Sequence, residues 1–199
     1  MSVDEERYEA FDDPYCYPNS EVLRNLADLR DEALLDSFEI EMTFLRSTEP
    51  LPEGNFDFEH YKAIHHHLFQ DVYGWAGQCR TVRISKGGNA FCYPEHIDNQ
   101  AAAVFRMLNR PAFQGQSNLS DFVAAAADFL AELNAIHCFR DGNGRSQLAF
   151  MYLVGQRAGF PFNFEGVQRD TFLPAMIASF NGDLTPLKSA LAALCSDGF

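Results

Sequence analysis

The sequence predicts an all-α fold with one small β-hairpin. Apolar residues recur at helical spacing along most of the 199-residue chain, whereas only residues 80–93 combine short β-prone runs with a turn signature. The 19 Phe residues add the expectation of an aromatic-rich core. A chain of this length can bury one sizeable core, so we expect a single domain over residues 1–199.

The first third of the chain predicts two well-marked helices. Residues 1–13 are acidic and are expected to be flexible. Ser20 is a candidate N-cap for a helical pattern that follows it, and a clearer helix is predicted from about Asp31 to Arg46. Its apolar stripe is expected to contain Leu34, Leu35, Phe38, Ile40, Met42 and Leu45. After the breaker "STEPLPEGN", a second helix is predicted from about Asp57 to Val72.

The hairpin is predicted in "RTVRISKGGNAFCY", where "KGGN" supplies the turn between two short runs. Further helices are predicted at about 95–109, 118–136, 144–158, 168–180 and 185–195. The helix from Leu119 to Ile136 should present one core face, because apolar residues recur along it at helical spacing, namely Leu119, Phe122, Val123, Ala126, Phe129, Leu130, Leu133 and Ile136. The next apolar run, "LAFMYLV", is apolar nearly all round and predicts a buried central helix.

Charge and cysteine usage exclude several classes of protein. The net charge of −13 disfavours direct binding to nucleic acid, because an acidic surface repels phosphate backbones. The five Cys residues include no CxxC pair, which favours a reduced, cytoplasmic compartment. No apolar run approaches the ~18 residues of a membrane span, and the acidic N-terminus shows no apolar core of a signal peptide.

The most informative stretch is "HCFRDGNGR", residues 137–145, which lies between two apolar helical segments. A helix N-terminus offers unpaired backbone N–H groups and a partial positive charge, and glycines allow an anion to approach them. Gly142, Asn143 and Gly144 therefore predict a phosphate cradle. Arg145 in the first helical turn suits a phosphate better than it suits helix stability.

Two further side chains of this stretch indicate chemistry. Asp141 offers a hard oxygen ligand for Mg²⁺, and His137 can act as a general base near neutral pH. A base, a metal ligand, an anion hole and an arginine together are the components of phosphoryl or nucleotidyl transfer. Zinc binding by His65, His66 and His67 is disfavoured, because consecutive helical residues point in different directions. A thiol protease dyad of Cys138 and His137 is also disfavoured, because the side chains of adjacent residues seldom face each other.

"HCFRDGNGR" resembles the motif His-x-Phe-x-(Asp/Glu)-Gly-Asn-Gly-Arg-x-x-Arg of Fic domains. "YPNSEVLRN", "IHHHLFQDVYGWAGQCRTVRISKGG" and "NGDLTPL" are also similar to segments of this family. The resemblance implies a Fic helical bundle with a core at about 57–160 and a hairpin, the flap, beside the active-site loop. It also implies transfer of AMP from ATP to a Ser, Thr or Tyr hydroxyl of a target protein, with release of pyrophosphate.

The resemblance implies a role for each matching residue. His137 would deprotonate the target hydroxyl, Phe139 would anchor the loop, and Asp141 would hold Mg²⁺ on the α- and β-phosphates. The amides of Gly142, Asn143 and Gly144 would form the anion hole, with the Asn143 side chain on the α-phosphate, and Arg145 would clamp the outer phosphates. The flap would bind the target by strand addition through Val82, Arg83, Ile84, Ser85, Lys86 and Gly87.

Two departures from the family motif stand out. Cys138 replaces the usual Pro after the histidine, and Leu148 replaces the last arginine. Losing one charge-assisted phosphate contact costs about 1.5–3 kcal/mol. Leu148 therefore leaves open weakened ATP use, a different nucleotide donor, or compensation by Arg157 or Lys86. The alternative function is a degenerate Fic protein with an altered donor or only a binding or regulatory role.

Regulation by an internal helix is not indicated. The inhibitory motif of the family places Ser or Thr four residues before a Glu that is followed by Gly or Asn. Only Glu53 and Glu165 precede such a residue, and Glu49 and Pro161 stand at the required position. The resemblance then implies a toxin whose inhibitory helix comes from a separate small antitoxin, with type II topoisomerase subunits as targets.

Overall fold

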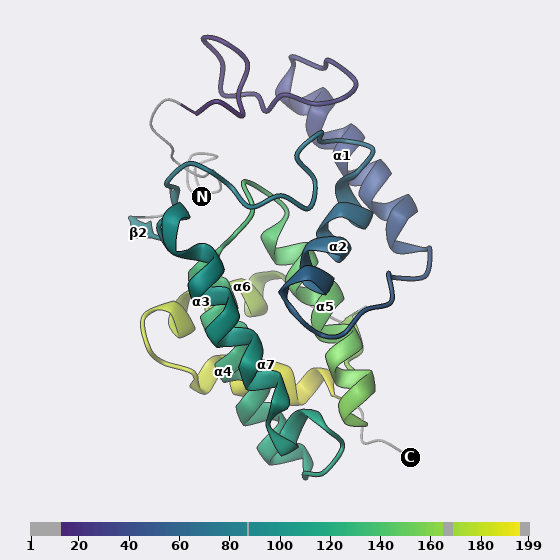
Figure 1. Cartoon of the computed structure of the whole chain (residues 1–199), viewed down its shortest axis with the longest axis vertical. Coiled ribbons are helices and arrows are strands. Elements are labelled where there is room, and N and C mark those ends of the chain that lie inside the picture. The colour runs from purple at the N-terminus through teal and green to yellow at the C-terminus, as the bar shows by residue number, and fades with distance from the viewer. Residues whose placement is uncertain (1–12, 87, 165–168, 196–199) are drawn as a thin grey trace. The chain divides into compact units, whose positions relative to one another are not determined.

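A computed structural model describes residues 13–86, 88–164 and 169–195 of the chain (Figure 1). Over these residues the chain forms seven α-helices and one two-stranded antiparallel sheet, which confirms the predicted fold class. The chain divides into two compact units. The first unit contains the N-terminal part up to Asn55, Glu59–Ile97 and His137–Asn143, and the second contains Phe56–Phe58, Asp98–Ile136 and the chain from Gly144 onward.

The regular elements of the first unit are two helices, a hairpin and a short 3-10 helix. They are α1 (Glu32–Ser47), α2 (Phe58–Phe69), β1 (Ser85–Lys86), β2 (Asn89–Ala90) and η2 (Pro94–His96). Ser85 pairs with Ala90 and Lys86 pairs with Asn89, so the strands are shorter than the runs that the sequence indicated. Beyond these pairs, one bond from Phe91 N to the Ile84 carbonyl continues the ladder. Gly87 lies outside the described residues.

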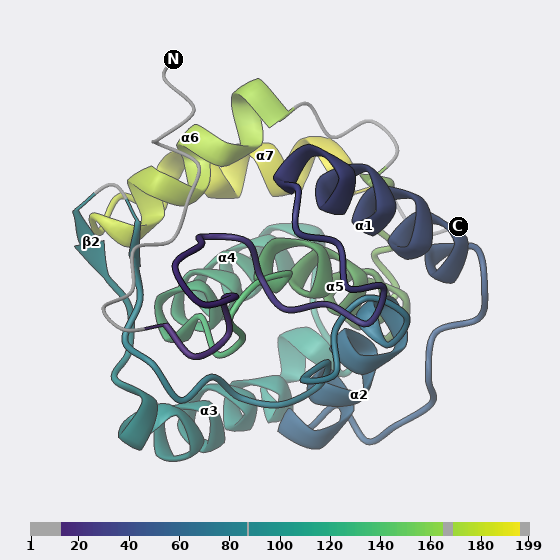
Figure 2. The ribbon, with the colours of Figure 1, turned by 90° about the horizontal axis from the view of Figure 1, so that it is seen from above.

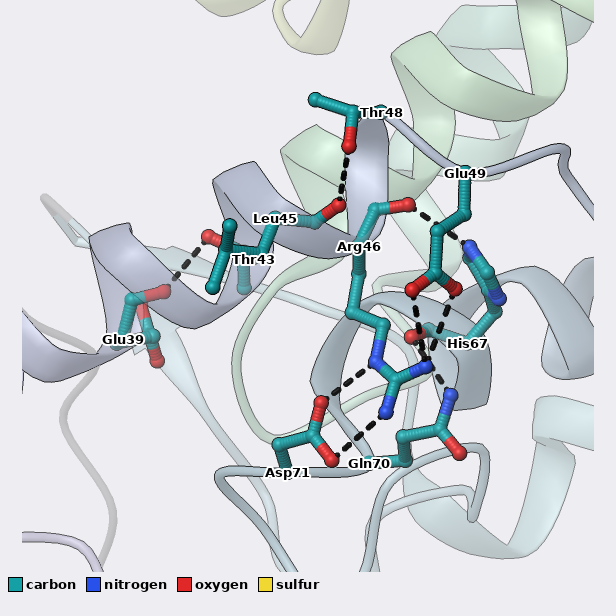
Figure 3. Close-up of polar contacts among 9 residues, drawn as sticks. All are labelled: Glu39, Thr43, Leu45, Arg46, Thr48, Glu49, His67, Gln70 and Asp71. Carbon is teal, nitrogen blue, oxygen red and sulfur yellow. Dashed lines mark hydrogen bonds and ion pairs between the residues drawn. The ribbon is translucent and has the colours of Figure 1, made fainter.

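Helix α1 is fixed at both ends by polar contacts. At its start the Asp31 carboxylate accepts a hydrogen bond from Leu34 N at 3.0 Å, which is an N-cap. Near its end, Arg46 donates two hydrogen bonds to the Asp71 carboxylate, and the Arg46 carbonyl lies 2.9 Å from His67 Nε2 (Figure 3). The hydrogen bonds from Arg46 hold the pKa of Asp71 below its usual range.

The predicted apolar stripe of α1 is only partly buried, since Leu35 is buried and Phe38 and Met42 are half-buried. Polar residues share the inward side, because Thr43 is buried and the half-buried Glu39 carboxylate accepts a hydrogen bond from the Tyr73 hydroxyl. Large apolar side chains on the rest of the helix are 51 to 65% exposed, namely Leu34, Ile40, Phe44 and Leu45. Polar contacts therefore decide which face of α1 packs inward.

No helix follows Ser20. The Ser20 hydroxyl accepts a hydrogen bond from Val22 N at 3.0 Å, which closes a turn instead of capping a helix. The side chain of Asn25 closes the next loop, since it donates to the Leu23 and Leu29 carbonyls and accepts from Leu29 N. These side-chain bonds replace the helical backbone bonds that the apolar pattern predicted.

The second unit contains the remaining helices. They are α3 (Ile97–Phe105), η3 (Arg106–Asn109), η4 (Pro111–Phe113), α4 (Leu119–Ile136), α5 (Asn143–Ala158), α6 (Arg169–Phe180) and α7 (Thr185–Leu194). Helices α6 and α7 pack against each other and against α4 (Figure 2). The expected aromatic core is present, because Phe105, Phe129 and Phe150 lie 5.5 to 6.0 Å apart by ring centroid.

Helices α4 and α5 differ in how well their burial matches the sequence pattern. Every predicted core position of α4 is buried except Leu119, which is half-buried. Helix α5 buries one face, including Phe150 and Val154, while Tyr152 is 41% exposed. The prediction that this segment is buried all round is therefore wrong. None of the helices in the described part of the chain is long and apolar enough to span a membrane.

Candidate active site

The loop from His137 to Asn143 joins α4 to α5 and belongs to the first unit. Its anchor is Phe139, which is fully buried. The Phe139 ring stacks on the His65 ring at 3.7 Å and meets the Tyr61 ring at 5.3 Å by centroid distance. Tyr61 and His65 are four residues apart and lie on one side of α2, so this side of the helix holds the loop through Phe139.

His65 also fixes the loop through its two ring nitrogens. Nδ1 accepts a hydrogen bond from Gly77 N at 2.8 Å, and Nε2 lies 3.0 Å from the Asp141 carbonyl oxygen. A backbone N–H can only donate and a carbonyl can only accept, so His65 is the neutral tautomer with its proton on Nε2. The structure thus gives this histidine a positioning role that the sequence analysis missed. The available signal was the row Tyr61, His65 and Phe69 at a spacing of four residues on α2.

No group of three or more His, Cys, Asp or Glu side chains suits a metal ion among the described residues. His66 Nδ1 lies 3.1 Å from the Ala76 carbonyl, and His67 Nε2 lies 2.9 Å from the Arg46 carbonyl. The histidine triplet of α2 is therefore engaged with backbone groups.

Gly142 occupies a position that only glycine fits. Its φ is +77°, and a Cβ there would lie 2.4 Å from Phe69 Cζ and 3.1 Å from His65 Nε2. The Gly142 N–H donates to the Asp141 carboxylate at 2.5 Å. The close approach of the loop to α2 therefore depends on the missing side chain.

The Asn143 side chain has a structural role in addition to the phosphate contact that the resemblance implies. Its Oδ1 accepts from Phe139 N at 2.9 Å, and its Nδ2 donates to the Phe139 carbonyl at 2.8 Å. The side chain is thus engaged within the loop, and Asn143 is only 1% exposed. Helix α5 begins at this residue, and the next two residues, Gly144 and Arg145, are exposed.

His137 adopts a rare backbone conformation, with φ at +48°. Non-glycine residues in this region cost of order 1–3 kcal/mol and cluster at functional sites. The His137 ring stacks on the Phe91 ring at 4.0 Å, with an angle of 20° between the planes. Its carbonyl accepts a hydrogen bond from Arg80 Nε at 2.7 Å. Residues at the base of the hairpin therefore fix both the ring and the backbone of His137.

Arg80 links the hairpin to the loop. The side chain is 2% exposed, and it donates to the carbonyls of His137, Val82 and Cys92. Its backbone N–H donates to the Cys138 carbonyl at 2.8 Å. Burial lowers the pKa of Arg80, because desolvation disfavours the charged form. No sequence pattern pointed to this residue, because its partners lie on both sides of the hairpin and far along the chain.

The hairpin side chains are placed as follows. Ile84 is buried, while Val82, Ser85 and Lys86 are half-buried. The Arg83 guanidinium lies over the Tyr93 ring at 3.9 Å and 3.5 Å from the Glu95 carboxylate. Strand β1 pairs with β2 alone among the residues that the structure describes.

Arg140 ties the loop to the N-terminal segment. Its Nε lies 2.6 Å from the Asp13 carboxylate, and the two side chains are only 8% and 9% exposed. Asp13 also accepts a hydrogen bond from Tyr15 N at 3.0 Å. The expected flexibility of residues 1–13 falls mainly on residues 1–12, which lie outside the described residues, whereas Asp13 itself is held by the ion pair.

Leu148 is half-buried and lies in the second turn of α5, which begins at Asn143. Compensation by Arg157 is contradicted by its contacts. Arg157 donates to Gln114 Oε1 at 2.6 Å and lies over the Phe56 ring at 4.7 Å. At ~1.5 Å rise per residue, it lies roughly 18 Å along α5 from Arg145.

Comparison with known proteins matches these features to one family. The family model described as "Fic/DOC family" matches residues 55–154. A probable protein adenylyltransferase of Sinorhizobium fredii is 47% identical over 93% of this chain and 97% of its own length. A probable protein adenylyltransferase of Escherichia coli K12 is 31% identical over 93% of each chain.

A solved structure shows the same fold. The N-terminal Fic domain of a VirB-translocated Bep effector from Bartonella quintana, with bound ADP, superposes with a TM-score of 0.81. It is 25% identical, and the match covers 92% of this chain and 94% of that one. The chain therefore belongs to the Fic/DOC family.

Proposed function

We propose that the chain is a protein adenylyltransferase, which transfers AMP from ATP to a Ser, Thr or Tyr hydroxyl of a target protein. The names of the Sinorhizobium fredii and Escherichia coli relatives support this activity, and the ADP in the Bartonella quintana domain supports an adenine nucleotide as ligand. The observation that carries the proposal is the loop itself. It holds His137 against the hairpin and leads directly into the start of α5.

His137 acts as the general base in this proposal. Its imidazole takes the proton of the target hydroxyl, the hydroxyl oxygen bonds to the α-phosphorus of ATP, and pyrophosphate leaves with the electrons of the broken P–O bond. The stack on Phe91 and the hydrogen bond from Arg80 restrict both the ring plane and the backbone of His137. Such restriction reduces the reorganisation needed to reach the reactive geometry.

The start of α5 binds the phosphates. The backbone N–H groups of Asn143 and Gly144 and the Arg145 side chain follow one another along the chain at a helix N-terminus, where an anion is stabilised. The Gly142 N–H donates to the Asp141 carboxylate in this structure and would join them only once that carboxylate turns to the metal ion. The Asn143 side chain holds the Phe139 backbone through Oδ1 and one N–H of its amide, and the second N–H would bond the α-phosphate.

Asp141 would hold the Mg²⁺ that accompanies ATP. Asp141 is half-buried. Its own backbone carbonyl lies 3.0 Å from His65 Nε2, so the backbone that carries the carboxylate is held in place. Mg²⁺ commonly uses one or two carboxylates, with phosphates and waters completing its shell. A single carboxylate therefore fits this ion better than a metal that needs an all-protein site. The ion would neutralise charge on the phosphates.

The flap, residues 82–87, would bind the target segment by strand addition along β1. Strands β1 and β2 form a two-stranded sheet to which a target strand would add, and main-chain pairing registers a target without demanding a particular sequence. Type II topoisomerase subunits are the targets that the family resemblance implies. Conversion of a hydroxyl to an AMP ester on such an enzyme suits a toxin.

A separate small antitoxin would supply the inhibitory helix. The exposed apolar side chains of α1 support a partner chain, because Leu34, Ile40, Phe44 and Leu45 are all more than half exposed on one helix. Exposed apolar surfaces of this kind commonly mark protein interfaces.

A degenerate Fic protein remains the second candidate, and Leu148 is the observation that favours it. One experiment separates the two. The purified chain is incubated with Mg²⁺, cell lysate and, in turn, each nucleoside triphosphate labelled at the α-phosphorus. We expect a labelled protein band with ATP, absent with His137→Ala and retained with the exposed control His96→Ala. A band with another nucleotide would correct the donor, and no band with any donor would favour the degenerate protein.

A further inference from the structure

Two thiols meet beside the catalytic loop. Cys138 follows His137 and is 1% exposed, whereas Cys79 precedes Arg80 and is half-buried. Burial raises the pKa of the Cys138 thiol, and the Cys79 side chain adds to this rise. The hydrogen bond of 2.8 Å from Arg80 N to the Cys138 carbonyl joins the two backbone segments at the same place. The sequence pattern showed neither fact, since these cysteines lie far apart along the chain and form no CxxC pair.

We propose that Cys79 and Cys138 are a redox pair, which hydrogen peroxide oxidises to a disulfide that slows transfer by displacing His137. The regulatory half rests on the proposed function, whereas the disulfide itself does not. The hydrogen bond of 2.8 Å from Arg80 N to the Cys138 carbonyl already holds the two backbone segments side by side, so the disulfide requires a local approach of two sulfurs and no rearrangement of the fold.

The chemistry assigns a different role to each thiol. Cys79 is the more accessible one, so its thiolate attacks a peroxide oxygen, gives a sulfenic acid and releases hydroxide. The Cys138 sulfur then attacks the Cys79 sulfur, loses its proton and displaces the hydroxyl as a second water. Two thiols and one peroxide thus yield one disulfide and two waters.

The surroundings suit this order of events. Burial raises the pKa of the Cys138 thiol, which makes it a poor first reactant and a suitable resolving thiol. The buried Arg80 guanidinium interacts electrostatically with both Cys79 and Cys138, and a nearby cation favours a thiolate. Cys92 also interacts with Arg80, but its thiol donates to the Tyr93 carbonyl.

The disulfide acts on the loop because of what adjoins it. An S–S bond of about 2.05 Å is shorter than a thiol–thiol hydrogen bond, so Cys138 is drawn toward Cys79. His137 is the next residue, and its carbonyl is held by Arg80, next to Cys79. A misplacement of about 1 Å at a catalytic group can lower the rate ~100-fold. We expect oxidation to reduce transfer at least about tenfold on the same basis, and reduction to restore it.

The test treats the full chain with hydrogen peroxide, blocks remaining thiols by alkylation and maps crosslinked peptides by mass spectrometry after digestion. AMP transfer is measured on the same samples before and after dithiothreitol. We expect a Cys79–Cys138 peptide and a reversible loss of transfer. Cys79→Ser should lose both effects and remain active, Cys138→Ala should also lose the crosslink, and the control Cys195→Ser should keep both.

The outcomes separate this proposal from the proposed function. Absence of the crosslink in the folded chain, while peroxide oxidises other thiols, would overturn the pair. A crosslink without loss of transfer would overturn its regulatory role. A reduced chain that transfers no AMP would overturn the proposed function, while the peptide map would still decide whether the two thiols pair.

Discussion

The ion pair between Asp13 and Arg140 should contribute strongly to stability, because both side chains are nearly inaccessible to water. Their exposed fractions are 9% and 8%, and the N–O distance is 2.6 Å. Removing one partner of a buried pair typically costs about 3–5 kcal/mol, since the remaining charge is buried without its counter-ion. We therefore expect Asp13→Asn to lower the free energy of unfolding by about that amount.

Urea denaturation followed by circular dichroism measures this effect. With an m value of about 3 kcal/mol/M, the midpoint should fall by roughly 1–2 M. Asp13→Ala should cost about 1 kcal/mol more, because it also removes the acceptor of the Tyr15 N–H. The double variant Asp13→Ala with Arg140→Met should regain much of the loss, because replacing a whole buried pair with apolar groups is often nearly neutral.

An exposed ion pair supplies the matched control. Arg30 and Asp28 are 66% and 70% exposed, so Asp28→Asn should change stability by less than about 1 kcal/mol. If Asp13→Asn behaves like Asp28→Asn, the N-terminal segment does not hold the loop and the reasoning is refuted.

Three further predictions concern the active site. Gly142→Ala should destabilise the chain and abolish transfer, because a Cβ would lie 2.4 Å from Phe69 Cζ at a φ of +77°; thermal unfolding and a transfer assay check this, and wild-type values in both would contradict it. Leu148→Arg should raise kcat/KM for ATP by about 10- to 100-fold, the equivalent of one charge-assisted phosphate contact of roughly 1.5–3 kcal/mol. The uncharged control Leu148→Met should leave steady-state kinetics unchanged, and an equal gain in both variants would argue against a phosphate contact. Removal of divalent ions with EDTA should stop transfer and Mg²⁺ should restore it, whereas transfer that persists in EDTA would remove the metal from the mechanism.

The helices could be predicted where burial repeats at helical spacing. Helix α4 shows this clearly, because Phe122, Phe129 and Leu133 pack into the core at the positions that the pattern indicates. Apolar content alone does not show which face of a helix packs inward, as α1 illustrates. Its inward face is chosen by Arg46 and Glu39, whose partners lie outside the helix.

The candidate site could be predicted where it is contiguous in sequence. The stretch from His137 to Arg145 carries its own pattern of charge, glycine and helix start. The residues that position it could not be found in this way, because their partners are distant along the chain. His65 bonds to Asp141, Arg80 bonds to His137, and Asp13 pairs with Arg140.

The role of Asn143 shows a second limit. A family motif identifies which residues matter, but it does not say whether a side chain meets the ligand or holds the loop. Here both polar atoms of the amide bond to the Phe139 backbone, so the side chain shapes the loop that presents the phosphate-binding amides.

Transfer of the α-phosphoryl group by His137 is the central claim, and one labelling comparison tests it most directly. Parallel reactions contain the chain, Mg²⁺ and a target lysate, with ATP labelled at either the α- or the γ-phosphorus. We predict protein label from the α-labelled ATP only, and none with His137→Ala. Label from γ-labelled ATP, or undiminished label with His137→Ala, would contradict the account.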